Sequence, residues 1–140
     1  MPSTDRHTDP TALHCLLYRS QIAPQADLRC IADIVKRARR FNPTQNISGL
    51  LVFDGNYFCQ YLEGSPSALN GLIRQIEVDP RHIEFEMLHH HPLEGTRRFT
   101  NWSMAYCVVD EEEYLSTFSF LQGPAALRKF EEIMPLLDIA

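Results

Sequence analysis

Gln60 lies in the middle of an apolar, strand-like run, Phe58-Cys59-Gln60-Tyr61-Leu62. A carboxamide in such a run needs a hydrogen-bond partner, because an unpaired buried amide costs about 1–3 kcal/mol. The partner is either a polar group of the protein or a bound ligand. Gln60 therefore marks a candidate site.

Two further polar side chains are expected near Gln60. Tyr18 ends a short strand predicted over residues 13–18, and Asn42 closes a helix predicted over residues 26–41. A phenol and two amides on neighbouring elements would form an uncharged trio of donors and acceptors, which suits a polar, planar, neutral ring. The three could instead satisfy one another or nearby backbone groups, and their spacing alone does not decide between these interpretations.

The elements that must position these side chains follow in a regular order. Asp54-Gly55 is typical of a two-residue hairpin turn, and Ser65-Pro66 is typical of a helix start. In chain order, we predict strand 13–18, helix 26–41, strands 47–53 and 56–62, helix 66–78, and strands 83–87 and 102–109. This order predicts an α+β, ferredoxin-like βαββαββ sheet with both helices on one face.

The length and composition predict one domain. The chain has 140 residues, of which 44% are hydrophobic, which is enough for a single core and too little for two. We expect residues 1–11 to be a flexible lead-in, residues 12–109 to form the domain, and residues 110–140 to form a C-terminal helical extension with further helices.

The last predicted helix carries an apolar stripe, Leu127, Phe130, Met134 and Leu137. Such a stripe can form a face for a partner or for a dimer, although it more often covers the helix's own domain. Both interpretations stay open at this point.

Charge and hydropathy disfavour several classes of protein. The formal net charge is −5, and the arginine pairs are too short to form a basic patch, so nucleic acid is not an expected partner. No apolar run approaches the roughly 18 residues that cross a bilayer, and the N-terminus lacks the order of a signal peptide. We therefore expect no membrane association and a cytoplasmic location.

The cysteines and histidines do not form a recognisable metal motif. The four cysteines are widely spaced, with no Cys-x-x-Cys pair, and are expected to be reduced and buried. His89-His90-His91 resembles a metal cluster, but consecutive strand residues point to opposite faces of a sheet. We predict no metal site.

Several ordered motifs across residues 12–109 resemble those of BLUF domains, which are blue-light sensors that use flavin. The motifs are Leu16-Leu17-Tyr18-Arg19-Ser20, Asn42, Ile47-Ser48-Gly49-Leu50-Leu51, Phe58-Cys59-Gln60-Tyr61-Leu62-Glu63-Gly64, Asp79-Pro80-Arg81-His82 and Asn101-Trp102-Ser103-Met104. The short length makes the chain similar to the stand-alone BLUF proteins.

The resemblance implies a non-covalent flavin, usually FAD, between the two helices. Tyr18 would donate an electron and a proton, Gln60 would reorient beside the ring, and Asn42 would contact the carbonyl edge of the ring. Further cofactor-binding residues implied by the resemblance are Ser20, Ile34, Ile76, Asp79, Arg81 and His82. Trp102 and Met104 would compete for a place beside Gln60 and begin the signal relay.

The resemblance implies a photoreceptor without enzymatic activity, acting through its C-terminal helices on an unidentified downstream protein or through a possible homodimer. One alternative is a flavin-dependent oxidoreductase, which the absence of a nicotinamide fingerprint or a nucleophile–base pair disfavours. The other is a ferredoxin-like small-molecule-binding regulatory module without a chromophore, which the fold alone would allow.

Overall fold

The computed structural model describes residues 12–27, 29–107, 122–133 and 137–139. In chain order, its elements are β1 (His14–Ile22), α2 (Cys30–Phe41), the 3₁₀ helix η2 (Asn42–Gln45), β2 (Ser48–Phe53), β3 (Tyr57–Gly64), α3 (Pro66–Val78), β4 (His82–Pro92), β5 (Trp102–Cys107), α5 (Pro124–Ile133) and β6 (Leu137–Ile139). The predicted lead-in, residues 1–11, and the first part of the predicted extension lie outside the described residues.

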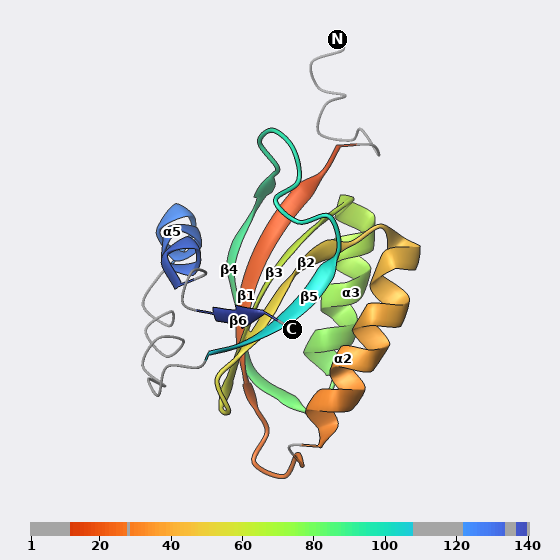
Figure 1. The fold of residues 1–140 in the computed structure, drawn as a ribbon, viewed down its shortest axis with the longest axis vertical. Helices are drawn as coiled ribbons and strands as arrows, with labels where there is room; N and C mark the ends of the chain where they lie inside the picture. Colours follow the sequence, from red (N-terminus) through yellow and green to blue (C-terminus); the bar gives the residue numbers. More distant parts are fainter. Residues whose placement is uncertain (1–11, 28, 108–121, 134–136, 140) are drawn as a thin grey trace.

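The strands form one sheet in the order β4-β1-β3-β2-β5-β6. The crossover from β1 through α2 to β2 leaves a gap of one strand, which β3 fills by pairing antiparallel with both neighbours. β5 then adds to the edge of β2 in a parallel direction. Helices α2 and α3 lie side by side on one face of this sheet (Figure 1). The predicted α+β, ferredoxin-like fold is confirmed.

The hairpin between β2 and β3 is confirmed, but its turn lies one residue later than predicted. The backbone N–H of Asp54 donates to the carbonyl of Tyr57 at 3.2 Å, so Gly55 and Asn56 form the centre of the turn. Gly55 has a φ of +100°, which favours glycine. The Asp54 carboxylate accepts hydrogen bonds from the N–H groups of Asn56 and Tyr57, at 2.9 and 2.7 Å. Asp54 therefore serves as an acceptor for the turn.

Local hydrogen bonds determine where helices α2 and α3 begin. In α3, the Ser65 hydroxyl accepts from the Ala68 N–H at 3.2 Å, and Pro66 occupies the first turn, as predicted. Helix α2 begins at Cys30, later than the predicted residue 26. The reason is local, since the Asp27 carboxylate binds the backbone N–H and the guanidinium of Arg29 and holds this segment in a turn.

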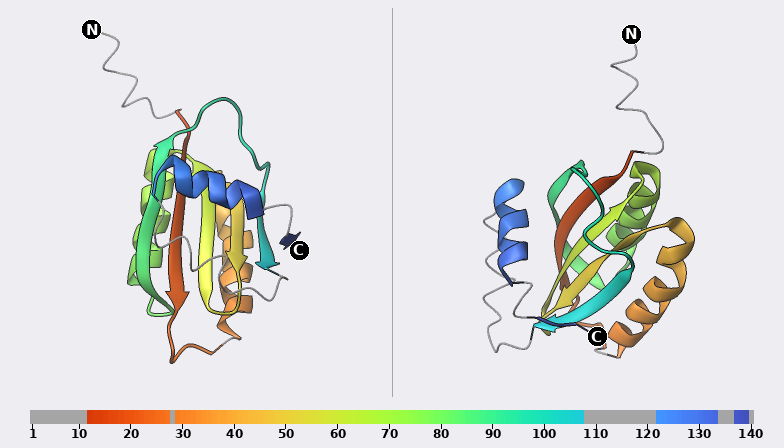
Figure 2. Two further views of the ribbon diagram at one scale, coloured as in Figure 1. Left: turned by 90° about the vertical axis from the view of Figure 1, so that its left-hand side faces the viewer. Right: turned by 45° about the horizontal axis from the view of Figure 1, so that its top comes forward.

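Alternating side chains build a core on each face of the sheet. The core under α2 and α3 contains Leu16, Tyr18, Ile31, Ile47, Leu51, Phe53, Phe58, Leu62, Leu69, Ile73 and Trp102. The core on the opposite face contains Cys15, Leu17, Leu50, Val52, Cys59, Tyr61, Leu88, Ala126 and Phe130. Figure 2 shows that α5 supplies the cover of this second face. Phe130 is 1% exposed and Leu127 packs against the same cluster, so the part of the stripe that the structure describes on α5 covers its own domain.

The prediction that Leu137 continues the last helix is wrong. Leu137 begins β6, which pairs antiparallel with β5, with Leu137 opposite Cys107 and Ile139 opposite Ala105. The outer edge of β5 has backbone donors and acceptors without a partner in β2, and a short strand satisfies them. The C-terminal part therefore contributes a strand as well as a helix. Met134 and Val109 lie outside the described residues.

Strand β4 is longer than the predicted residues 83–87. Its pairing with β1 shifts register twice, and Glu84 has a φ of +52°. The histidine run lies within β4 and alternates as expected, since the His89 and His91 rings stack at 5.9 Å while His90 contacts His14. Among the described residues, no group of histidines, cysteines and carboxylates is arranged to hold a metal ion, and no helix is long and apolar enough to span a bilayer.

Replacing Phe130 with alanine is expected to lower the free energy of unfolding by about 3–5 kcal/mol, because the ring leaves a cavity against Tyr61. Urea unfolding followed by circular dichroism measures this change. The control is Glu132→Ala on the exposed side of the same helix, which should change stability by about 0.5 kcal/mol or less. Equal effects of the two substitutions would mean that α5 does not pack on the sheet.

Candidate functional site

A pocket of about 250 Å³ lies against the sheet face that α2 and α3 cover. Apolar side chains from the two helices, including Ile34 and Ile76, form its walls. The residues predicted to bind a cofactor all line it except Ser20. The pocket is also lined by residues that sequence analysis did not assign, namely Arg37, Ala38, Phe41, Leu51, Leu72, Gln75 and Val78. Leu72 lies three residues before Gln75 and four before Ile76, so helical periodicity could have placed Leu72 beside both.

Tyr18, Gln60 and Trp102 form a continuous hydrogen-bonded chain in this pocket. Tyr18 and Gln60 are direct partners across β1 and β3. The Gln60 amide Nε2 donates to the Tyr18 hydroxyl oxygen at 2.6 Å, and the Trp102 indole Nε1 donates to Gln60 Oε1 at 2.8 Å. All three side chains are buried. The buried carboxamide therefore has two protein partners.

Trp102 fixes the orientation of the Gln60 amide. An indole N–H can only donate, so the amide must turn its oxygen toward Trp102 and its NH₂ group toward Tyr18. The Tyr18 oxygen then accepts from Gln60, which leaves the phenolic hydrogen available to an acceptor in the pocket. Burial raises the pKa of Tyr18 despite the hydrogen bond from Gln60, so the phenol is neutral at physiological pH.

Asn42 lines the same pocket but does not bond to this chain of side chains. It is 2% exposed, and its backbone carbonyl accepts from the Ile47 N–H at 3.0 Å, which holds the end of α2 in place. The hydrogen bond between Tyr18 and Gln60 agrees with the interpretation that these side chains satisfy one another, and the binding of a planar ring stays a prediction. Tyr18 and Gln60 satisfy one another, and Asn42 turns toward the space beside them.

Met104 lies opposite Leu51 in the register of β2 and β5, and its side chain is outside the described part of the structure. The other member of the predicted pair, Trp102, contacts Gln60 through its indole N–H. A competition between the two stays a prediction.

Sequence analysis missed one aromatic contact at the site. The ring of Phe85, on β4, stacks on Tyr18 with 5.0 Å between centroids. The sequence placed Phe85 within the predicted strand 83–87, but it did not give the register that puts the ring beside Tyr18. This packing holds the phenol from the side opposite to Gln60's strand.

Charged side chains gather at one end of the pocket. Arg81 forms a two-pronged ion pair with Asp79, with Nε–Oδ1 and Nη2–Oδ2 distances of 3.0 and 2.7 Å. Burial by itself would raise the pKa of Asp79, but the hydrogen bonds from Arg81 outweigh it and lower the pKa. Burial lowers the pKa of His82, so this imidazole is neutral at physiological pH.

Ser20 lies behind His82. Its hydroxyl is 2.8 Å from His82 Nδ1, and the side chain is fully buried. The structure therefore places Ser20 as a support for a residue that lines the pocket. Direct contact between Ser20 and a cofactor stays a prediction.

The fold and this pocket define a class of flavin-using sensory domains. Residues 13–105 match the family described as BLUF, sensors of blue-light using FAD. The chain belongs to the BLUF family. Among solved structures it resembles the dark state of BlrB, a BLUF protein, with a TM-score of 0.64 and 27% identity over 90% of this chain and 88% of that one.

Two curated relatives contain a similar segment within longer proteins. Photoactivated adenylate cyclase subunit beta of Euglena gracilis is 33% identical over 115 residues, which are 82% of this chain and 13% of the cyclase. The blue light- and temperature-regulated antirepressor BluF of Escherichia coli (strain K12) is 37% identical over 70 residues, which are 50% of this chain and 17% of the antirepressor. The chain thus spans a small part of the length of these relatives.

Replacing Asp79 with asparagine tests the charged end of the pocket. The folded state lowers the pKa of Asp79 from its ordinary value of 3.8, so the stabilisation by Arg81 is complete above that value and is lost as the pH falls through the lowered pKa. We expect Asp79→Asn to cost about 1 kcal/mol at neutral pH, and the difference from wild type to shrink at about pH 3. Urea unfolding at both pH values measures this.

The control for this pH dependence is Glu77→Gln, which removes an exposed carboxylate on α3. It should leave the free energy of unfolding nearly unchanged at both pH values. A difference between wild type and Asp79→Asn that stays constant from neutral to acidic pH would contradict the assignment of the ion pair.

Proposed function

We propose that this chain is a blue-light photoreceptor that binds FAD non-covalently in the pocket beside Tyr18 and Gln60, and that it has no catalytic activity of its own. The hydrogen-bonded chain from Trp102 through Gln60 to Tyr18 carries this proposal, because it places an easily oxidised phenol and a reorientable amide together in a pocket. Membership of the BLUF family supports the choice of cofactor.

The residues of the pocket fit a flavin. Its ring is flat, with apolar and hydrogen-bonding edges, and the pocket offers the apolar walls Ile34 and Ile76 together with the amide of Asn42. The phenolic hydrogen of Tyr18 is free to meet an acceptor. At the charged end, the guanidinium of Arg81 suits the phosphates of the nucleotide. We choose FAD over FMN because the family is described as using FAD.

Bound flavin supplies the photochemistry, since its excited state is a strong oxidant. With flavin bound, Tyr18 would supply an electron and its phenolic proton and would recover both, so no substrate would be consumed. Gln60 would then rearrange its amide and change which of its atoms face Tyr18 and Trp102. A hydrogen-bond exchange worth about 1–2 kcal/mol changes the ratio of two conformations about five- to thirty-fold.

The output would pass from Trp102 along β5 to the C-terminal part of the chain. β5 carries Trp102 at its start and pairs with β6 at its other edge. Relatives named as a photoactivated cyclase and as an antirepressor suggest that such domains act on different effectors. We propose that this chain acts on a downstream protein or on a second copy of itself.

The visible spectrum of the purified protein before, during and after blue light tests this function. A flavin spectrum that shifts slightly to the red and recovers in the dark supports the photoreceptor. Flavin that bleaches and turns over an added electron donor would instead indicate a flavin-dependent oxidoreductase. A protein that stays colourless after incubation with FAD would support the remaining alternative, a small-molecule-binding regulatory module that has no chromophore.

Gln60→Leu is expected to retain bound flavin and to abolish the light-induced red shift, because an apolar isostere can neither donate nor accept. The change also leaves the Trp102 N–H without its acceptor, so we expect a loss of about 1–3 kcal/mol in stability. Difference spectroscopy and thermal unfolding measure the two effects. A red shift of normal size in this variant would exclude the role of Gln60.

Tyr18→Phe is expected to block the photocycle with little loss of flavin, since only the hydroxyl is removed. The matched control is Tyr57→Phe, on a half-buried tyrosine that does not line the pocket. Flash photolysis followed by absorbance recovery compares the two variants. A complete, reversible cycle in Tyr18→Phe would show that another donor serves the flavin.

A further inference from the structure

Glu63 is a fully buried carboxylate that the proposed photocycle does not use. It lies on β3, three residues beyond Gln60, and its side chain belongs to the opposite face of the sheet. Its Oε2 accepts from the Tyr61 hydroxyl at 2.9 Å, and its Oε1 accepts from the Ser48 hydroxyl at 3.3 Å. A buried carboxylate is costly unless donors surround it, so these contacts require an explanation.

The strongest contacts of Glu63 reach the segment that leads into Trp102. The backbone N–H of Arg98 donates to Oε2 and Oε1 at 2.8 and 3.0 Å, and the N–H of Phe99 donates to Oε1 at 3.1 Å. Every neighbour of the carboxylate is a donor, as an ionised carboxylate requires. Glu63 thus fixes two consecutive peptide groups, three and four residues before Trp102.

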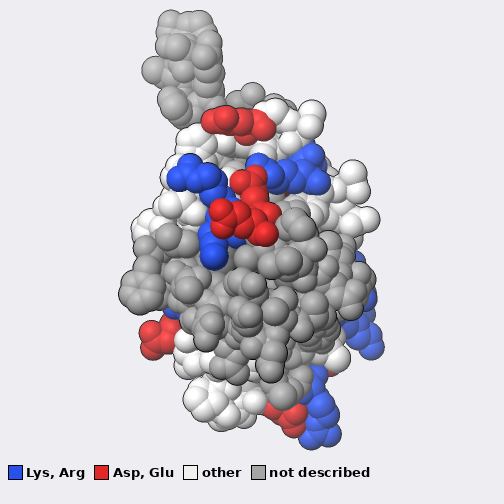
Figure 3. Space-filling view, turned by 60° about the vertical axis from the view of Figure 1, so that its left-hand side comes forward, with Lys and Arg blue, Asp and Glu red and all other residues white. Residues whose placement is uncertain are grey.

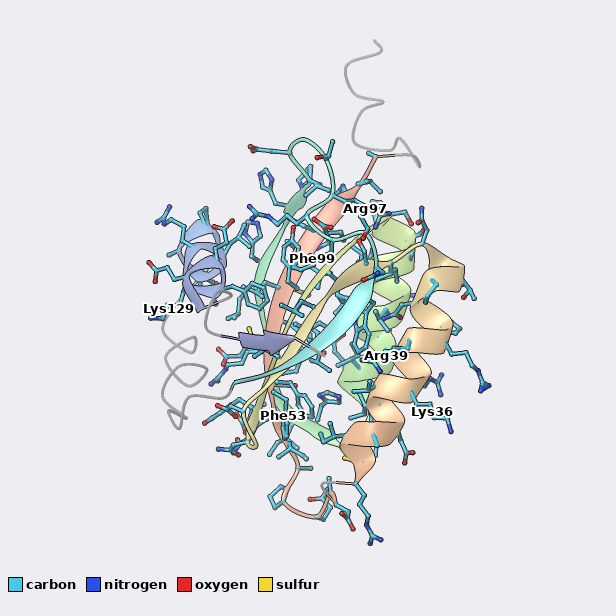
Figure 4. All side chains as sticks on the ribbon, in the orientation of Figure 1. Lys36, Arg39, Phe53, Arg97, Phe99 and Lys129 are labelled. Carbon is cyan, nitrogen blue, oxygen red and sulfur yellow. The ribbon has the colours of Figure 1, made fainter. Side chains whose placement is uncertain are left out.

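The side chain of Arg97 also ties this segment to β2, β3 and a residue shortly before β2. Its guanidinium donates to the Ser48 hydroxyl at 2.7 Å, to the Glu63 backbone carbonyl at 3.2 Å and to the Asn46 carbonyl at 2.8 Å. Figure 4 shows Arg97 and Phe99 at the same end of the sheet. The segment before β5 is therefore held at three successive residues, by the side chain of Arg97 and by the backbone N–H groups of Arg98 and Phe99.

The anchored segment continues without a break into the strand that carries the indole. The Gly49 N–H donates to the Asn101 carbonyl at 3.1 Å, and Gly49 is the register partner of Trp102. A Cβ on Gly49 would lie 2.0 Å from the Tyr61 carbonyl, so β2 and β3 approach here more closely than a side chain permits. Only Thr100 and Asn101 separate Phe99 from Trp102, so we expect a shift of residues 97–99 to move the start of β5 and with it the Trp102 indole.

We propose that Glu63 is a positioning residue for the photosensory site. Its carboxylate holds the backbone N–H groups of Arg98 and Phe99 and thereby sets the place of the Trp102 indole against the Gln60 amide. This inference rests on the proposed function only for its effect on the light response. Its effect on Trp102 itself is independent of flavin.

The substitution Glu63→Gln tests this role in the 140-residue chain. Glutamine keeps one acceptor oxygen and puts an NH₂ group at the other position. In either amide orientation this NH₂ group faces the backbone N–H of Arg98, whose nitrogen is 2.8 Å from Oε2 and 3.0 Å from Oε1, so Arg98 loses one of its two hydrogen bonds to the side chain. The matched control is Glu94→Gln, the same change on an exposed carboxylate in the same connection. Circular dichroism and thermal unfolding record whether each variant folds.

Trp102 is the only tryptophan in the sequence, so its fluorescence reports on this position directly. Without added flavin, we expect Glu63→Gln to shift the emission to longer wavelength and to increase quenching by acrylamide, while Glu94→Gln matches wild type. With flavin, we expect Glu63→Gln to change the rate of dark recovery by about threefold or more. A stabilising role alone would lower the unfolding temperature and leave both signals unchanged.

Emission and recovery of Glu63→Gln identical to those of wild type would overturn the proposal. If Glu63→Gln does not fold, Ser48→Ala replaces it, because this change removes one donor to Glu63 and one acceptor for Arg97, and the same two signals decide. Movement of Trp102 emission in a protein whose wild-type form shows no light response would support the role of Glu63 and reject the photoreceptor function.

Discussion

The orientation of one buried amide governs the site. Trp102 can only donate, so it fixes the Gln60 oxygen, and the Gln60 nitrogen in turn fixes which part of the Tyr18 hydroxyl is used. Each bond in this chain determines the polarity of the next. The surrounding structure serves this arrangement, since β1 and β3 put Tyr18 opposite Gln60 and β5 brings the indole to them from two strands away.

The two faces of the sheet have different tasks. The face toward α2 and α3 holds the pocket, and the face toward α5 holds the carboxylate of Glu63 among donors. Arg98 joins these faces to the C-terminal helix, because its backbone binds Glu63 while its guanidinium pairs with Glu131 of α5. Figure 3 shows that basic and acidic side chains lie close together on this face of the molecule. Arg98 therefore links the buried carboxylate of Glu63 to α5.

Local patterns predicted much of this structure. Alternation and turn chemistry were enough for the hairpin and for the start of α3, because these depend on neighbouring residues. The prediction was wrong at Leu137, since a short apolar tail pairs with a strand edge only when that edge is nearby. The anchor at Glu63 was missed for a similar reason. Its donors come from residues 97–99, and only the tertiary fold brings their backbone to β3.

The side chains of Tyr18, Gln60 and Trp102 at the sheet side of the pocket carry no charge, which bears on how their arrangement responds to pH and salt. Amides and indoles do not titrate in water, and burial keeps the phenol of Tyr18 and the imidazole of His82 in their neutral forms. Moderate changes in acidity or salt therefore find no charged group to act on among these side chains. The resting arrangement of Tyr18, Gln60 and Trp102 is thus insulated from the ionic conditions around the protein.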